Sequence, residues 1–495
     1  MGAPERATGS AGTLLEHAGE GSPVASAAPH PTAPRPLMAG TALALLTCTA
    51  LLVSFSESML IPALPTIQAQ FGSNAADISW VPAIYLLVGA ISVPLFGKLG
   101  DLYGKKRMLT FVMLAYSIAV ILDGFAWNLP SLLVFRAVQG LGLAMFPLAI
   151  SLIHDEAVAA RVPVAVGLIT SMNGVGAAIG LIGGAYITQT FSWQTNYNLL
   201  APFAVVLTLL LYLVARESTQ LTRERIDYVG LSIFGLTITM LLLAISEGGI
   251  LGWTSTATIT LFALSAIFAV ALVVAERHVT NPLFEIHLPE VGSILKVDFA
   301  MLVAGAVMFM GFYMVIYFAQ EPTIGLGRDV EKAALILAPA ALLMLVFAPL
   351  GGRLAQRWGS KPVELIGTFL VIVGFVSLLL LHSGAQELGA GCVVLFAGVS
   401  FLLTALSISI LILSPAGSVG SEVGLNTSFR TLGQAIGVAI SGAFLAGFLV
   451  PGTLLPSDEA YALTAYAGIA LGIVALLLLA SLPNLKVKGS PPLAE

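Results

Sequence analysis

The chain of 495 residues has too few charged side chains to cover soluble domains. Asp, Glu, Lys and Arg make up 9% of it and hydrophobic residues 58%, and the mean hydropathy is +0.97. Soluble domains carry about 25% charged residues, so most of the apolar surface is expected to face lipid. This composition, with a small net charge of -5, excludes a soluble enzyme and a nucleic-acid-binding protein.

The two ends of the chain differ from its middle. Residues 1–37 are rich in Ala, Pro, Gly and Ser and lack periodicity, which predicts a disordered cytoplasmic tail. The first apolar run begins at Leu37 and many more follow, so we interpret it as a retained membrane helix rather than a cleaved signal. Residues 483–495 are predicted to form a second cytoplasmic tail.

Between the tails, runs of about 18–25 mostly apolar residues recur, each long enough to cross roughly 30 Å of hydrocarbon. We therefore predict an all-α polytopic membrane protein with fourteen transmembrane helices. Their extents are residues 38–64, 78–99, 107–127, 130–152, 163–187, 198–215, 229–246, 257–275, 297–318, 333–351, 363–381, 391–414, 425–449 and 461–482.

The basic residues support this helix count and an orientation. If the N-terminus is inside, Arg328 and Lys332 fall outside, Arg136 lies within a span, and the other 18 of the 21 Lys and Arg fall inside. Lys and Arg concentrate on cytoplasmic loops. We therefore expect a multi-pass protein of the plasma or inner membrane with both termini in the cytoplasm.

An internal repeat divides the chain. Residues 97–107, GKLGDLYGKKR, lie between the second and third predicted helices, and a weaker copy, GRLAQRWGSK, lies at 352–361 between the tenth and eleventh. Six helices, two extra helices and six more helices therefore follow one another. We predict six-helix bundles at 38–215 and 297–482, with the two extra helices and their loops at 216–296.

Glycines at four-residue spacing occur on two helices that correspond in this repeat, the fifth and the thirteenth. Small faces of this kind let helix backbones approach closely in lipid. The glycines expected to pack in this way are Gly176, Gly180, Gly183, Gly184, Gly433 and Gly437.

These motifs resemble those of a known family. The 97–107 segment is similar to the G-x-L-a-D-r-x-G-r-k-r signature of the major facilitator superfamily, and residues 136–142, RAVQGLG, resemble its R-x-x-Q-G-x-G element. Four further segments resemble the fourteen-helix drug:proton antiporter branch: Trp80-Val81 with Tyr85-Leu86, Gly252-Trp253, Asn281-Pro282-Leu283 and Arg430-Thr431-Leu432-Gly433. The resemblance covers residues 38–482. It implies the major facilitator fold and an inner gate formed by Gly97, Asp101, Gly104 and Arg107.

Two positions depart from that branch. Ser56 stands where the branch has an Asp in its first helix, and Glu57 follows it. Leu181 replaces the Pro of the glycine element in the fifth helix. Both departures favour an alternative, a transporter of the same fold that carries one specific metabolite without proton antiport.

Charges within the hydrocarbon region cost about 2.5–3.5 kcal/mol each and by default mark ion or substrate paths. Glu57 and Arg136 share a depth of roughly 8–10 Å below the outer surface. We expect them to pair across a central cavity, so that protonation of Glu57 releases Arg136. A static ion pair that joins two helices is the alternative.

Substrate contacts are expected from soft and aromatic side chains of the ninth helix, with lipid-facing filler as the alternative. Met308, Tyr313 and Tyr317 are the candidates there, and Tyr85 and Phe146 are comparable. Asp123, near the outer end of the third helix, either contacts substrate or a proton or simply reaches headgroup water.

No phosphate-binding loop, hydrolase elbow or metal-binding motif occurs in the sequence, and no soluble segment is large enough for a nucleotide-binding domain. We therefore expect no enzyme activity, no cofactor and no metal, and a proton gradient as the energy source. The sequence predicts a monomeric secondary transporter that exports amphipathic drugs or toxic compounds, cationic ones among them, in exchange for protons by alternating access. A transport-dead membrane sensor or membrane enzyme is a further alternative.

Overall fold

Helices form almost all of the regular structure in the computed structural model, which describes residues 2, 36–156, 162–217, 227–278, 291–414, 419–453 and 455–485. Both predicted tails lie almost wholly outside these residues. The first part of the chain contains α1 (Pro36–Ser58), η1 (Ile61–Ala63), α2 (Leu64–Phe71), α3 (Ala75–Tyr103), α4 (Lys105–Asp123), α5 (Leu129–Gly140), η2 (Leu141–Ala144), α6 (Met145–Glu156), α7 (Val162–Thr190) and α8 (Trp193–Val214). The rest contains α9 (Tyr228–Leu251), α10 (Thr256–Glu276), α11 (Val291–Gln320), α12 (Val330–Trp358), α13 (Ser360–Leu380), α14 (Ala385–Leu413), α15 (Val419–Gly447) and α16 (Asp458–Ala480).

Within the described residues these sixteen α-helices make fourteen rods, because α2 continues α1 and α6 continues α5. The 3₁₀ helices η1 and η2 form the joints. Pro62 and Pro65 lie in the first turns of η1 and α2, where a missing backbone N–H leaves no helical hydrogen bond unmade. The rods agree one for one with the predicted helices.

Twelve helical segments are long and apolar enough to cross a membrane, counted over the described residues alone. α4 and α7 are not among them. α4 begins with Lys105, Lys106 and Arg107 and ends with Asp123, so its apolar stretch is short. The protein is therefore multi-pass, and fourteen crossings remain a prediction.

Glycines of α7 bring its backbone against the end of α1. A Cβ atom added at any of three glycines would collide with backbone atoms of that segment, and the same holds for two glycines of α15 against α11. The contacts are Gly176 on Leu51, Gly180 on Phe55, Gly184 on Met59, Gly433 on Leu302 and Gly437 on Ala306. Close packing of small residues is a main source of helix association in lipid. The two helix pairs that correspond in the sequence repeat are therefore packed in the same way.

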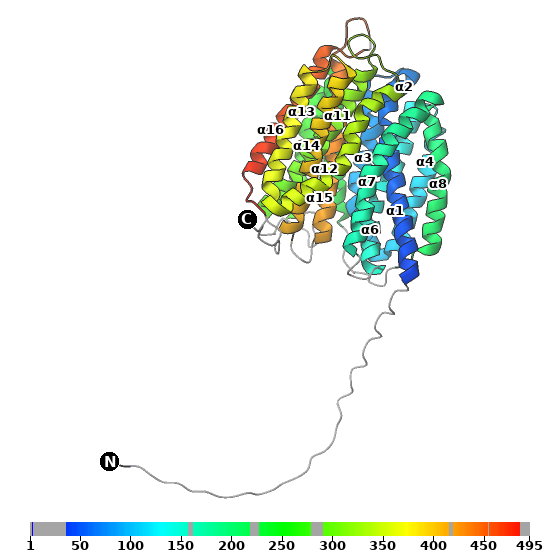
Figure 1. Ribbon diagram of the computed structural model, residues 1–495, viewed down its shortest axis with the longest axis vertical. Helices are drawn as coiled ribbons and strands as arrows, with labels where there is room; N and C mark the ends of the chain where they lie inside the picture. The colour runs from blue at the N-terminus through cyan, green and yellow to red at the C-terminus, as the bar shows by residue number, and fades with distance from the viewer. Residues whose placement is uncertain are drawn as a thin grey trace.

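The two halves of the chain meet along two seams, α3 against α15 and α7 against α12. In Figure 1 the labelled helices up to α8 gather on one side of the molecule and α11 to α16 on the other. α9 packs on both α3 and α15, and α10 packs on α9. The Trp80 indole of α3 donates to Ser246 Oγ of α9 at 3.1 Å. The first extra helix therefore covers one seam between the halves, while the domain boundaries at 215 and 296 remain predictions.

We expect Gly184→Ala to destabilise the protein, because the added methyl group would lie 2.5 Å from the Met59 carbonyl oxygen. Overpacking of this kind costs about 1–3 kcal/mol. Gly183, which was also predicted to pack closely, is a matched control: its added Cβ would lie 3.6 Å from the Phe55 ring, an ordinary contact. Thermal unfolding of the purified variants should show a lower midpoint for Gly184→Ala than for Gly183→Ala. Equal midpoints would contradict the proposed packing.

Candidate functional site

Arg136 of α5 lies in the interior of the N-terminal half, with 1% of its surface exposed. Its Nε donates to the Val81 carbonyl at 3.2 Å, and its Nη1 donates to Gln139 Oε1 at 2.7 Å and to the Tyr197 hydroxyl at 3.4 Å. The ring of Tyr85 lies against the guanidinium, with 4.5 Å from Cζ to the ring centroid. Neutral acceptors and an aromatic face therefore hold this cation in place.

Glu57 lies in the last turn of α1 and is half-buried. No ion pair among the described residues joins Glu57 to Arg136, so the predicted contact between these two side chains is absent from this conformation. The neighbouring Ser56 faces the Arg136 cluster instead, and its Oγ accepts from Gln139 Nε2 at 2.6 Å. Successive helical residues point about 100° apart, so Glu57 is turned away from that cluster.

Arg430 of α15 and Arg136 of α5 both lie within electrostatic reach of Glu57. The sequence assigned Arg430 to the cytoplasmic side, but it lies well inside α15, which begins at Val419. Its backbone carbonyl is packed against Gly305 of α11. The sequence signal for the buried position of Arg430 is the segment 430–433. Gly433 in this segment lies on the face of α15 that packs on α11. Glu57 is thus influenced by the charge of one cation from each half of the chain.

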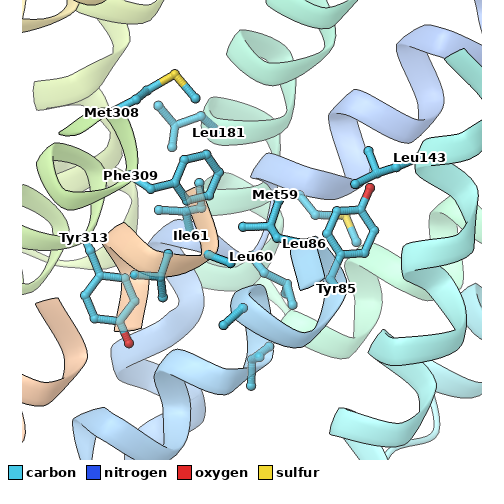
Figure 2. Packing of buried hydrophobic residues seen from close by; sticks show 14 of the residues in the cluster. Met59, Leu60, Ile61, Tyr85, Leu86, Leu143, Leu181, Met308, Phe309 and Tyr313 are labelled. Carbon is cyan, nitrogen blue, oxygen red and sulfur yellow. The ribbon is translucent and has the colours of Figure 1, made fainter. Parts of the chain in front are cut away.

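Met308, one of the predicted substrate residues, belongs to the main hydrophobic core. Figure 2 shows Met308 and Phe309 of α11 beside Leu181 of α7 and Ile61 of η1. Phe146 of α6 is half-buried at the edge of the same hydrophobic core. Leu181, which stands where the resembling branch has Pro, therefore fills space where the two halves meet.

Tyr313 and Tyr317, also predicted to contact substrate, join the two halves near the predicted outer end. The Tyr317 hydroxyl donates to Gln68 Oε1 at 2.9 Å, and the Tyr313 hydroxyl donates to the Ala75 carbonyl at 3.3 Å. Both rings are buried and stack on each other with centroids 4.8 Å apart. The two tyrosines therefore link α11 to α2 and α3 of the other half.

Asp123 ends α4, and none of its surface is exposed. The interpretation that it reaches headgroup water is wrong, because α5 and α8 pack against α4 and cover it. Neither of its carboxylate oxygens has a hydrogen-bond partner. Asp123 therefore lies in the interior of the N-terminal half, within electrostatic reach of Arg136.

The signature loop between α3 and α4 is anchored by a residue that the sequence did not single out. Lys106 N donates to Glu217 Oε1 at 3.1 Å, and Arg107 Nε lies 3.5 Å from Glu217 Oε2. Asp101 Oδ1 lies 3.9 Å from Lys105 Nζ within the loop itself. Glu217 follows α8 by three residues and has no motif around it, so only the fold brings it to this loop.

Gly104 and Gly97 occupy different environments in this motif. Gly104 turns the chain from α3 into α4 with a positive φ of 107°, and a Cβ atom there would collide with the Glu217 carboxylate. Gly97 lies within α3, and an added Cβ would meet no atom within 4 Å. The motif therefore needs glycine at position 104 for this conformation and does not need it at 97.

We expect Gly104→Ala to lower the free energy of unfolding by about 1–3 kcal/mol, because L side chains are strained at such a φ and Glu217 would be displaced. Gly97→Ala provides the comparison and should leave stability unchanged or slightly higher, since alanine favours a helix. The unfolding midpoints of the two purified variants measure the difference. A Gly104→Ala protein as stable as Gly97→Ala would refute this view of the loop.

Among the residues that the structure describes, no three His, Cys, Asp or Glu side chains come together as metal ligands would.

Comparison with known proteins identifies the family. A model described as Major Facilitator Superfamily matches residues 46–438. Multidrug resistance protein 3 of Bacillus subtilis (strain 168) is 26% identical over 407 residues, which cover 79% of this chain and 77% of that protein. The uridine/deoxyuridine transporter of Lactococcus lactis subsp. cremoris (strain MG1363) is 26% identical over 412 residues, covering 78% of this chain and 82% of that protein.

The fold is also similar to that of a solved transporter. The crystal structure of a bacterial homologue of the human lysosomal transporter Spinster, in an inward-facing and unoccupied conformation, matches with a TM-score of 0.64. The match covers 89% of this chain and 96% of that chain at 14% identity. Because the family match spans most of its length, the chain belongs to the major facilitator superfamily and is a multi-pass membrane transporter, not an enzyme.

Proposed function

We propose that this transporter exports amphipathic or cationic compounds in exchange for protons by alternating access of two six-helix bundles, 38–215 and 297–482. The observation that carries the proposal is the position of Glu57, a half-buried acid in the field of Arg430 from one half and Arg136 from the other. Ionisable groups at membrane depth are costly and usually lie on ion or substrate paths. Glu57 is an acid at the centre whose charge can change.

The exchange follows from electrostatics between the halves. Ionised Glu57 attracts Arg430 and so stabilises conformations that bring α1 and α15 together. A proton on Glu57 removes that attraction and shifts the balance between conformations. A cationic compound that binds beside Glu57 replaces the proton as its counter-charge, so that one leaves when the other binds.

The names of the relatives support export of varied compounds, and the motifs support the fourteen-helix drug:proton antiporter branch. In this proposal Gly97, Asp101, Gly104 and Arg107 form the inner gate with Glu217, while Met308 and Phe146 border the substrate path. The distribution of Lys and Arg supports an inner-membrane location with both termini in the cytoplasm. The protein would act as a monomer powered by the proton gradient.

A narrower transporter is the second candidate. Leu181 replaces the Pro of the branch and lies in the same hydrophobic core as Met308, which favours a narrower substrate path. A relative with similar coverage is named as a uridine/deoxyuridine transporter. Selectivity for one small metabolite, without proton exchange, is therefore the alternative to polyspecific export.

We expect Glu57→Gln to abolish substrate-induced proton movement, because the glutamine has no second charge state. The measurement uses proteoliposomes with an imposed pH gradient, a pH dye inside, and a panel of lipophilic cations and neutral amphiphiles. Wild-type protein should dissipate the gradient with several compounds, and Glu57→Gln should do so no faster than protein-free liposomes.

Glu331→Gln is the control, since Glu331 is an acid in the first turn of α12, away from the centre. It should behave like the wild type. Proton movement at the wild-type rate in Glu57→Gln would show that another group couples transport. If no compound moves protons while a single radiolabelled nucleoside still crosses the membrane, the narrower transporter replaces the antiporter.

A further inference from the structure

The N-terminal half holds a second buried acid that the proposed exchange at Glu57 does not use. Asp123 has no exposed surface, and no hydrogen-bond donor reaches either carboxylate oxygen. An ionised carboxylate without donors is strongly disfavoured in a protein interior. Such a group is stable there when it carries a proton or gains a cation in direct contact.

Several titratable groups lie within electrostatic reach of Asp123. Arg136 comes from α5, Tyr197 from α8 and Tyr116 from α4 itself, and each interacts electrostatically with the Asp123 carboxylate. The ring of Tyr85, from α3, packs against the Arg136 guanidinium. Arg136 is the only cation that acts on Asp123 among the described residues.

Arg136 does not contact this carboxylate in the conformation described. No ion pair joins the two side chains among the described ones, because the guanidinium donates to Val81, Gln139 and Tyr197. The charge of Arg136 therefore acts on Asp123 without direct contact between the two side chains. A rotation of the Arg136 side chain towards α4 would replace the missing contact.

Two hydrogen bonds connect the Arg136 side chain to α1, so movement of α1 can affect its rotation. Arg136 Nη1 donates to Gln139 Oε1 at 2.7 Å, and Gln139 Nε2 donates to Ser56 Oγ at 2.6 Å. Ser56 is the residue next to Glu57. Movement of α1 relative to α5 would break or stretch these bonds and free the guanidinium.

We propose that Asp123 is a second proton-binding residue of the transport cycle, loaded while Arg136 is held by Gln139 and emptied when Arg136 turns to it. In the emptying step the O–H bond of Asp123 breaks, the proton passes to water that enters when α1 moves, and Arg136 becomes the counter-charge of the carboxylate. The inference rests on the proposed antiport, because it adds one proton per cycle to the proton carried by Glu57.

Infrared spectroscopy tests the loaded state without requiring transport. A protonated carboxyl group has a C=O stretching band that shifts in heavy water, and the wild-type protein should lose such a band in Asp123→Asn. Asp458→Asn, which removes an exposed acid in the first turn of α16, should keep it. Tyr116→Phe should shift the band while leaving Asp123 in place, so the assignment does not depend on one variant. No Asp123-dependent band would overturn the proposal.

The proton count tests the coupling role. With tetraphenylphosphonium as substrate in proteoliposomes, Asp123→Asn should exchange one proton fewer per cation than the wild type and lose the response to an imposed membrane potential. It should still respond to a pH gradient through Glu57. An unchanged proton count would overturn the inference and leave the antiport proposal intact. A wild type that shows the Asp123 band but moves no protons would overturn the antiport, and the coupling role of Asp123 with it.

Discussion

Close backbone contact between small residues is the constraint on which the site depends. Lipid tails are as apolar as helix surfaces, so the hydrophobic effect does not drive helix association in the membrane. Van der Waals packing therefore decides which helices meet and at what depth. α7 packs on α1 at Phe55 and Met59, on either side of Glu57. α11 packs through Gly305 on the carbonyl of Arg430 itself. The positions of Glu57 and Arg430 are thus set by the points where helix backbones touch.

The two halves share this packing but not its chemistry. Glu57 follows the Gly180 contact on Phe55 of α1 by two residues, and Met308 follows the Gly437 contact on Ala306 of α11 by two residues. One half therefore presents an acid at this position and the other a thioether.

The extra helices have a structural place that their sequence did not indicate. α9 lies along the seam between α3 and α15, with Gly249 against the backbone of Ala443 and the Trp253 ring 6.0 Å from that of Phe444. α10 exposes apolar side chains such as Ile267 and Val270, as a lipid-facing helix would. Because α9 contacts a helix from each half, relative motion of the halves changes its contacts at this seam.

The sequence by itself determined the helices, the family and the glycine faces. Apolar run length and local motifs carry that information without reference to distant residues, and the rods follow the predicted spans closely. Tertiary structure alone decided which charges interact. Whether Glu57 or Ser56 faces Arg136, whether Arg430 lies at the centre, and whether Asp123 meets water all depend on how each helix is rotated about its axis. That rotation is set by packing against neighbouring helices, and a change of one residue turns a side chain by about 100°.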